Sequence, residues 1–238
     1  MTSRAENPCL KGYWAGRVNC HLCGVPSPMP FKAVGTGPLA SSLRAAESYA
    51  LPAGATILMA GDPAVAVFSI REGFIKLWRR DDAGRCRIVR LMRPGDMLGL
   101  EATFQEEYQL SAATLSPAKL CRIPVELLTR LENDDPVVYH EVERRWHGQL
   151  NQADDLASSV QTGPSRERVL KLLRFMAEFA APDPCPRIRR LDMAAMLDIS
   201  SETAARVIAD LKKAGLLEEA PNELRFEPDR LRLHDAAG

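Results

Sequence analysis

The stretch that most constrains this chain is Leu191–Leu217, which divides into two helix-length pieces around a short turn. The first piece is Asp192–Leu197, the turn follows it, and the second piece runs from about Ser201 to a glycine at position 215. Ser200 can cap the second helix, because a serine hydroxyl accepts from the first backbone N–H groups. Two helices joined by so short a turn are typical of a DNA-reading helix-turn-helix, although an ordinary helical hairpin has the same outline.

The start of the second helix predicts the residues that would read bases. Glu202 and Arg206 are four residues apart and therefore share one helix face. A carboxylate can accept from a cytosine or adenine amine, and a guanidinium can donate to guanine. We expect the DNA contacts to come from this face, at Ser201, Glu202, Ala205 and Arg206.

Composition limits the classes of function. The chain has 31 basic and 31 acidic residues, so a general polyanion binder is not expected, and dimerisation would have to supply much of the avidity for DNA. No Ser/His/Asp set or phosphate loop is present, and we expect no enzyme. No apolar run approaches the roughly 20 residues that span a bilayer. The first residues lack the apolar stretch of a signal peptide, which predicts a cytoplasmic protein without membrane contact.

The segment from Leu51 to Pro124 reads as short β-like runs separated by Gly, Pro and Asp. Even spacing of such runs predicts a compact antiparallel barrel or roll. A turn of Asp and Gly at 81–84 predicts a hairpin between two of them. The expected strands are Thr56–Met59, Val65–Ile70, Phe74–Arg80, Arg85–Met92, Leu110–Leu115 and Ala118–Ile123.

A long helical segment follows Pro136 and is clearly interrupted only at Gly163-Pro164. Its apolar residues recur at intervals of three and four and form a narrow seam. Such a seam suits a two-helix dimer interface, although packing against the chain's own barrel is the alternative. The predicted dimerisation residues are Val138, Val142, Trp146, Leu150, Ala153, Ala157 and Val160.

These segments predict an α+β chain with four parts. A helix is expected at Ser165–Ala180, a hairpin wing at Leu216–Phe226, and a short helix near Ser41–Ser48. The parts are a cysteine-bearing arm at 1–30, a β-roll at 31–124, a dimerisation helix at 125–162 and a winged helix-turn-helix at 163–238.

This order and several short motifs resemble the CRP/FNR superfamily of bacterial transcription regulators over nearly the whole chain. The motifs are Leu51-Pro-Ala-Gly54, Ala60-Gly-Asp62, Arg71-Glu-Gly73-Phe-Ile-Lys76, Arg93-Pro-Gly-Asp96-Met-Leu-Gly99, Cys121-Arg-Ile-Pro124 and Ser201-Glu-Thr-Ala-Ala-Arg206. The resemblance implies a jelly-roll-like sensor domain, a homodimer, palindromic double-stranded DNA as partner, and RNA polymerase if the protein is an activator.

The family's effectors can be compared with these residues. Cyclic-nucleotide members carry an arginine in the phosphate-binding turn, and no arginine lies between Pro94 and Cys121 here, so no cyclic nucleotide is expected. Haem needs an axial ligand, and no histidine lies between Phe31 and Tyr139. Haem bound through a cysteine, or a small molecule without an iron–sulfur cluster, remains the alternative sensor.

The six cysteines favour metal or redox chemistry over disulfides in a cytosolic chain. The FNR-type oxygen sensors hold an iron–sulfur cluster with three arm cysteines and one from the roll. By that resemblance we expect a cluster, most simply 4Fe–4S, on Cys9, Cys20, Cys23 and Cys121. The gap between Cys9 and Cys20 is longer than in the family, which leaves Cys86 as a substitute. Alone, Cys20-x-x-Cys23 could be a redox dithiol or half of a zinc site.

Two further residues depart from the family. Ala205 replaces a serine on the recognition helix, which predicts looser reading of the outer base of the half-site. Ala153 occupies the seam where an aspartate would repel its symmetry mate, which predicts that dimerisation is partly constitutive.

Overall fold

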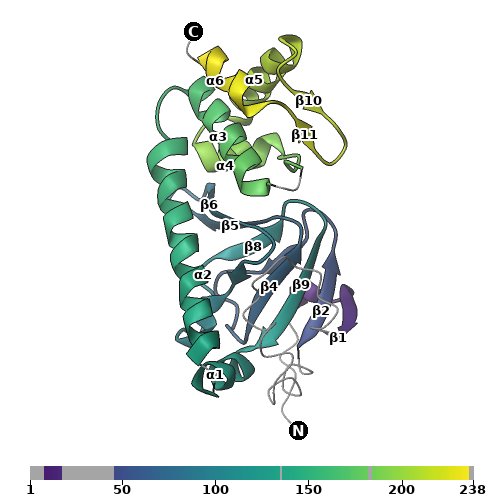
Figure 1. Cartoon of the computed structure of the whole chain (residues 1–238), viewed down its shortest axis with the longest axis vertical. Coiled ribbons are helices and arrows are strands. Elements are labelled where there is room, and N and C mark those ends of the chain that lie inside the picture. The colour runs from purple at the N-terminus through teal and green to yellow at the C-terminus, as the bar shows by residue number, and fades with distance from the viewer. Residues whose placement is uncertain (1–7, 18–45, 135, 182–183, 236–238) are drawn as a thin grey trace. The chain divides into compact units, whose positions relative to one another are not determined.

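The computed structural model describes residues 8–17, 46–134, 136–181 and 184–235 of the 238-residue chain. The chain forms two compact units, one β-rich and one mainly helical (Figure 1). The first unit joins Met1–Leu77 to Leu91–Asn151, and the second joins Trp78–Arg90 to Gln152–Gly238. None of the described helices is long and apolar enough to cross a membrane.

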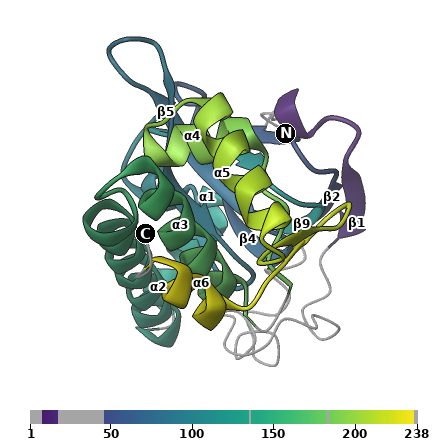
Figure 2. The ribbon, with the colours of Figure 1, turned by 90° about the horizontal axis from the view of Figure 1, so that it is seen from above.

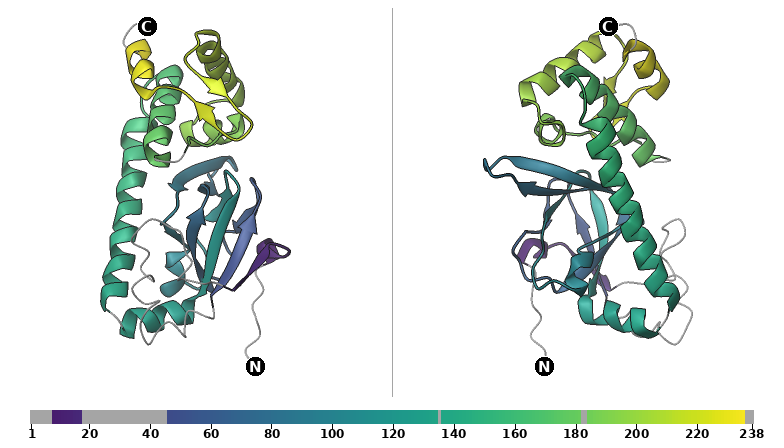
Figure 3. Two further views of the ribbon diagram at one scale, coloured as in Figure 1. Left: turned by 45° about the vertical axis from the view of Figure 1, so that its right-hand side comes forward. Right: turned by 90° about the vertical axis from the view of Figure 1, so that its left-hand side faces the viewer.

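The β-roll consists of two sheets (Figure 3). The larger has the strand order β1-β2-β9-β4-β7, and the smaller has the order β3-β8-β5-β6. The strands are β1 (Trp14–Arg17), β2 (Glu47–Leu51), β3 (Thr56–Leu58), β4 (Ala66–Glu72), β5 (Ile75–Arg80), β6 (Cys86–Met92), β7 (Met97–Leu98), β8 (Ser111–Thr114) and β9 (Ala118–Pro124).

Six of these strands confirm the β-like runs predicted from the sequence, and β5 and β6 flank the predicted turn. The α+β class is confirmed as well. The prediction of a helix near Ser41–Ser48 is wrong where the structure describes it, since Glu47 and Ser48 begin strand β2. Pairing overrides local preference here, because β2 lies between β1 and β9 and bonds to both. Strands β1 and β7 were not expected.

Register in the larger sheet decides which residues share a face. Cys121 on β9 lies directly opposite Ser48 on β2 and Ser69 on β4. Paired residues on adjacent strands point to the same side of a sheet, so these three side chains share one face. The next pair along, Leu120 with Ile70, points to the other face and is fully buried.

The roll leads into helices α1 (Val125–Asp134) and α2 (Pro136–Asp155), then a single π-helical turn over Leu156–Val160. Proline fits the first position of α2, where its missing N–H is not needed. Helix α2 is a long rod in both views of Figure 3. It is anchored to the roll by Val142, which is buried in the core, and by Gln149, whose Nε2 donates to Met97 O at 2.7 Å.

The second unit contains α3 (Ser165–Ala180), α4 (Arg190–Leu197), α5 (Ser201–Lys213) and α6 (Pro228–Asp235) (Figure 2). Two short antiparallel strands, β10 (Glu218–Glu219) and β11 (Leu224–Arg225), form the predicted wing hairpin. Helix α3 has the predicted bounds and packs against α4, α5 and α6. Its core residues are Val169, Leu170, Leu172, Leu173 and Met176, all fully buried.

Candidate nucleic-acid interface

The turn between α4 and α5 forms the predicted helix-turn-helix. Asp198 follows the last residue of α4 and adopts a left-handed conformation, with φ 52° and ψ 50°. Its backbone N–H donates to Ala194 O and closes the helix. Ser200 is extended, and its Oγ accepts from the backbone N–H of Thr203 at 3.1 Å, as expected of a cap. Gly215, at φ 65°, follows the other end of α5.

The two helices are fixed to each other by apolar side chains. The other buried residues of α5 lie three or four positions after Ala204 and three or four positions before Leu211, which places all of them on one face. The buried apolar residues of the pair are Met193, Met196, Leu197, Ala204, Val207, Ile208 and Leu211. This packing leaves the opposite face of α5 to solvent.

The predicted base readers lie on that solvent face. Glu202, Ala205 and Arg206 are exposed, and Ser201 is half-buried. The Ser201 hydroxyl donates to Glu202 Oε1 at 3.0 Å. Hydrogen bonds from its own backbone N–H and from the hydroxyls of Ser200 and Ser201 hold the pKa of the Glu202 carboxyl below its usual range. An ionised carboxylate at a helix N-terminus is an acceptor, which is what an exposed base amine requires.

The wing is attached to the helix-turn-helix through Glu219, which sequence reasoning did not single out. Its carboxylate pairs with Arg190 on α4 and, at 3.1 Å, with Lys212 on α5. Burial raises the pKa of Glu219, but hydrogen bonds from Arg190 and Lys212 outweigh it and leave the pKa below its usual range. One side chain therefore joins β10 to both helices of the motif.

The predicted thiol ligands are only partly described. Cys20 and Cys23 lie outside the described residues. Cys121 is 2% exposed on the sheet face that it shares with Ser48 and Ser69. Cys9 is half-buried, and burial raises the pKa of its thiol, with a smaller contribution from the Asp62 carboxylate.

The two remaining described cysteines, Cys86 and Cys185, differ in their surroundings. Cys86, the substitute ligand, is exposed on β6 in the second unit, whereas Cys9 and Cys121 belong to the first. Cys185 is buried, and burial raises the pKa of its thiol to about 12. Within the described part of the chain, no three His, Cys, Asp or Glu side chains form a group that could hold a metal ion.

The interior of the roll contains an ion pair that sequence reasoning missed. Arg122 Nη1 lies 3.6 Å from Glu47 Oε2, with the side chains 14% and 13% exposed. The Tyr49 hydroxyl donates to the same carboxylate at 3.0 Å. Ser111 lies in the segment between Pro94 and Cys121 that has no arginine, and its hydroxyl accepts from the backbone N–H of Ala60 at 3.0 Å. The arginine on β9 is therefore already matched by a carboxylate.

The predicted seam on α2 divides in two. Val142 and Val160 are buried within the chain. Trp146 is 39% exposed and Leu150 is 50% exposed. Ala153 is half-buried and Ala157 is exposed, while the side chain of Val138 lies outside the described residues. The ring of Trp146 stacks on Phe104 of the roll, with centroids 5.3 Å apart and planes at 10°.

The sequence of this chain is similar to one described protein family over part of its length and to several known regulators over more of it. Residues 50–135 match the family described as cyclic nucleotide-binding domain. The chain is 26% identical over 182 residues to the transcriptional activator protein anr of Pseudomonas aeruginosa, covering 74% of this chain and 75% of that protein. It is 25% identical over 167 residues to the anaerobic regulatory protein of Pasteurella multocida, covering 68% of this chain and 61% of that protein.

Solved structures agree on the fold. A CRP-family transcriptional regulator of Thermus thermophilus superposes with a TM-score of 0.66 at 22% identity, over 79% of this chain and 96% of that one. The proteins that the chain resembles are transcription regulators and not enzymes, which agrees with the sequence expectation.

Proposed function

We propose that this chain is a transcription regulator of the CRP/FNR type that binds palindromic DNA as a homodimer under redox control, which its similarity to such regulators supports. The proposed signal is oxygen or another oxidant, sensed through an iron–sulfur cluster in the cytoplasm. The single observation that carries DNA reading is the capped α5 helix, with Glu202 and Arg206 exposed on one face. Contact with RNA polymerase is part of the proposal if the protein activates transcription.

Base reading is assigned to four residues of α5. Glu202 accepts from a cytosine or adenine amine, and Arg206 donates to guanine O6 and N7. Ser201 keeps the Glu202 carboxylate oriented and contributes at most a weak base contact. Ala205 offers only a methyl group, so the outer base of the half-site is read less strictly.

Binding-site selection from random duplexes tests this assignment. A bidentate arginine–guanine pair contributes about 1–3 kcal/mol of discrimination, so Arg206→Ala should abolish specific binding. Ala205→Ser should change preference at one base only. Lys213→Gln, an exposed cation at the far end of α5, is the matched control and should retain the wild-type site. Selection of the same site by Arg206→Ala protein would refute the assignment.

Dimerisation is assigned to the exposed side of α2, with Trp146 and Leu150 at its centre. Two recognition helices on a two-fold axis read half-sites about one helical turn apart. The chain's net charge of zero supports binding as a dimer, because a single DNA-binding domain gains little affinity from non-specific attraction to the phosphates.

Redox sensing is assigned to thiolates of Cys9, Cys20, Cys23 and Cys121, with Cys86 as the substitute for Cys9. Four thiolates are the usual donor set for a 4Fe–4S cluster, which when bound supplies an oxidisable centre. The buried Cys121 would hold it on the roll, and the arm cysteines would tie residues 1–30 to the same place. Loss of that tie frees the arm and lowers dimer and DNA affinity. Similarity to a protein named as an anaerobic regulator supports this assignment.

Iron and acid-labile sulfide analysis of anaerobically purified protein tests the cluster. Serine variants of Cys9, Cys20, Cys23 and Cys121 should each lose iron, whereas Cys86→Ser should retain it. Loss of iron in Cys86→Ser together with retention in Cys9→Ser would make Cys86 the fourth ligand. Cys185→Ala is the control, because its thiol stays protonated at neutral pH and should not bind iron. A broad violet-blue absorbance that bleaches in air is expected. A sharp, intense band would instead indicate haem, and a colourless protein would indicate a small-molecule sensor.

A further inference from the structure

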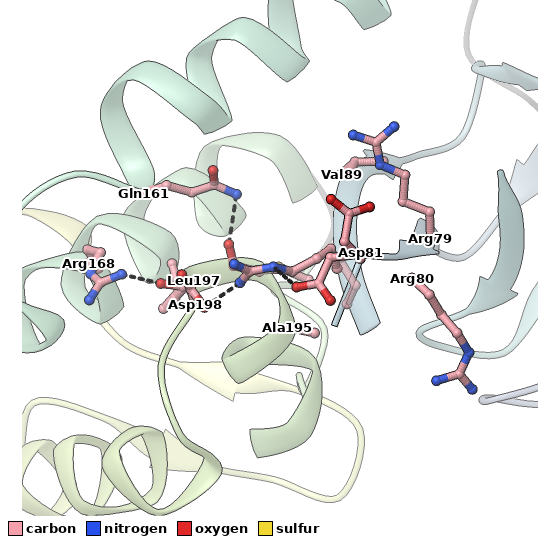
Figure 4. A pocket seen from close by; sticks show the side chains of 13 residues that line it. Arg79, Arg80, Asp81, Val89, Gln161, Arg168, Ala195, Leu197 and Asp198 are labelled. Carbon is pink, nitrogen blue, oxygen red and sulfur yellow. Dashed lines mark hydrogen bonds and ion pairs between the residues drawn. The ribbon is translucent and has the colours of Figure 1, made fainter. Parts of the chain in front are cut away.

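The C-terminal end of α4 is held by side chains from outside the helix-turn-helix. The last carbonyls of a helix lack partners within it. Here Gln161 Nε2 donates to Met196 O at 2.8 Å, and Arg168 Nη1 donates to Leu197 O. Gln161 follows the π-helical turn and Arg168 lies on α3, so both belong to the second unit (Figure 4).

Asp198, the next residue, has an unusual backbone. Among the described residues it alone has a positive φ without being glycine. Glycine is the common choice at this position after a helix, because a Cβ makes the left-handed conformation unfavourable. Its carboxylate is engaged, since Asp198 Oδ1 lies 2.6 Å from Arg87 Nη1 and 3.7 Å from Arg85 Nη1. Because aspartate is less favourable than glycine in this conformation, we expect the Asp198 side chain to have a role of its own.

The arginines come from the hairpin between β5 and β6, whose tip belongs to the second unit. Asp81 holds the hairpin together by accepting from the backbone N–H groups of Ala83 and Arg85. The same carboxylate lies 3.4 Å from Arg87 Nε, so Arg87 is oriented before it meets Asp198. Asp81, Arg87 and Asp198 all line one pocket of about 600 Å³. Figure 4 shows the side chains around it.

We propose that Arg87 is a positioning residue for the recognition helix, acting through Asp198. Asp198 lies two residues before Ser200, the cap of α5, so a restraint on Asp198 fixes the direction in which α5 leaves the turn. The strands that carry Arg87 run directly into the roll, which makes the hairpin a covalent route from the roll to the turn. This inference rests on the proposed DNA-binding function.

The test uses the intact chain and four variants. Arg87→Gln and Asp198→Asn each remove one charge, and asparagine tolerates the left-handed conformation. The third variant combines both changes. Arg80→Gln is the matched control, since Arg80 lies on the same hairpin and donates to Gly84 O. Amide hydrogen exchange of residues 199–203 is measured without DNA. Affinity is measured over a range of salt with the duplex that wild-type protein selects.

Arg87→Gln and Asp198→Asn should each raise exchange at 199–203 and weaken specific binding by about two- to fivefold, as expected for a partly exposed ion pair. The double variant should be no worse than the larger single effect. Arg80→Gln should match wild type, and the salt slope of binding should be unchanged by Arg87→Gln.

Several results would overturn the proposal. They are unchanged exchange at 199–203, additive effects in the double variant, or an equal effect of Arg80→Gln. A fall in the salt slope would make Arg87 a direct phosphate contact instead. If wild-type protein selects no duplex, the proposed function fails, whereas the exchange measurements still decide whether the pair restrains the turn.

Discussion

Among the glycines that the structure describes, Gly73 is the one at which neighbouring atoms leave least room for a side chain. It has φ +83°, and a Cβ there would lie 2.2 Å from Pro117 O and 2.8 Å from Ala118 Cα. Gly73→Ala should therefore lower the free energy of unfolding by about 2–4 kcal/mol, from strain in the left-handed region plus overpacking. Gly84→Ala is the control, since Gly84 has φ +75° but nothing within 4 Å, and should cost only about 1 kcal/mol. Urea unfolding measures both, and equal losses would contradict the clash.

Residues whose roles depend on near neighbours could be predicted from the sequence. Ser200 as a cap and Gly215 after α5 follow from the few residues around each, and both have the expected conformation. The pairing of Asp198 with Arg87 could not be predicted, because it joins residues far apart in the chain whose meeting depends on tertiary structure. Glu219 escaped notice for the same reason, since Arg190 and Lys212, which both pair with it, lie on different helices.

At the scale of the element, the wing depends on an ionised Glu219. Its pKa is lower in the folded protein than in the unfolded chain, so its stabilisation is present above the unfolded pKa and is lost as the pH falls through the folded pKa. Glu219→Gln should lower the free energy of unfolding by about 1–2 kcal/mol at neutral pH. The variant should also lose less stability than wild type as the pH falls. Glu218→Gln, exposed on the same strand, should change neither. Thermal unfolding from neutral pH to below pH 4 makes the comparison, and parallel curves for Glu219→Gln and wild type would contradict it.

Strands β2 and β9 show why some elements were harder to predict than others. Strand β9 was expected as one of the evenly spaced β-like runs between Leu51 and Pro124. Strand β2 reads Glu-Ser-Tyr-Ala-Leu, in which glutamate, alanine and leucine favour helix. Its pairing with β9 from Glu47 to Leu51 supplies the hydrogen bonds that decide the outcome. No local signal could have indicated that pairing.

For the whole molecule, the order of roll, long helix and winged helix-turn-helix followed from the periodicity of the sequence. The change from short alternating runs to a spacing of three and four marks where strands end and helices begin. The domain boundaries stay a prediction. The role of each seam residue could not be predicted from that spacing. Apolar residues recur every three or four positions whether the helix packs against the roll of its own chain or against a partner helix. Val142 faces the core of the chain itself, whereas Leu150, on the same helix, is half exposed.

That division on α2 separates folding from assembly. Leu150→Asp should place two like charges at the proposed dimer axis and weaken dimerisation at least tenfold, with little change in monomer stability. Val142→Ala should do the reverse, costing about 2 kcal/mol of stability while leaving the dimer intact, because its side chain is 6% exposed within the first unit. Sedimentation of cluster-free protein at micromolar concentration measures the dimer. Wild-type protein should remain partly dimeric because Ala153, not an aspartate, lies in the seam, and a clean wild-type monomer would contradict this.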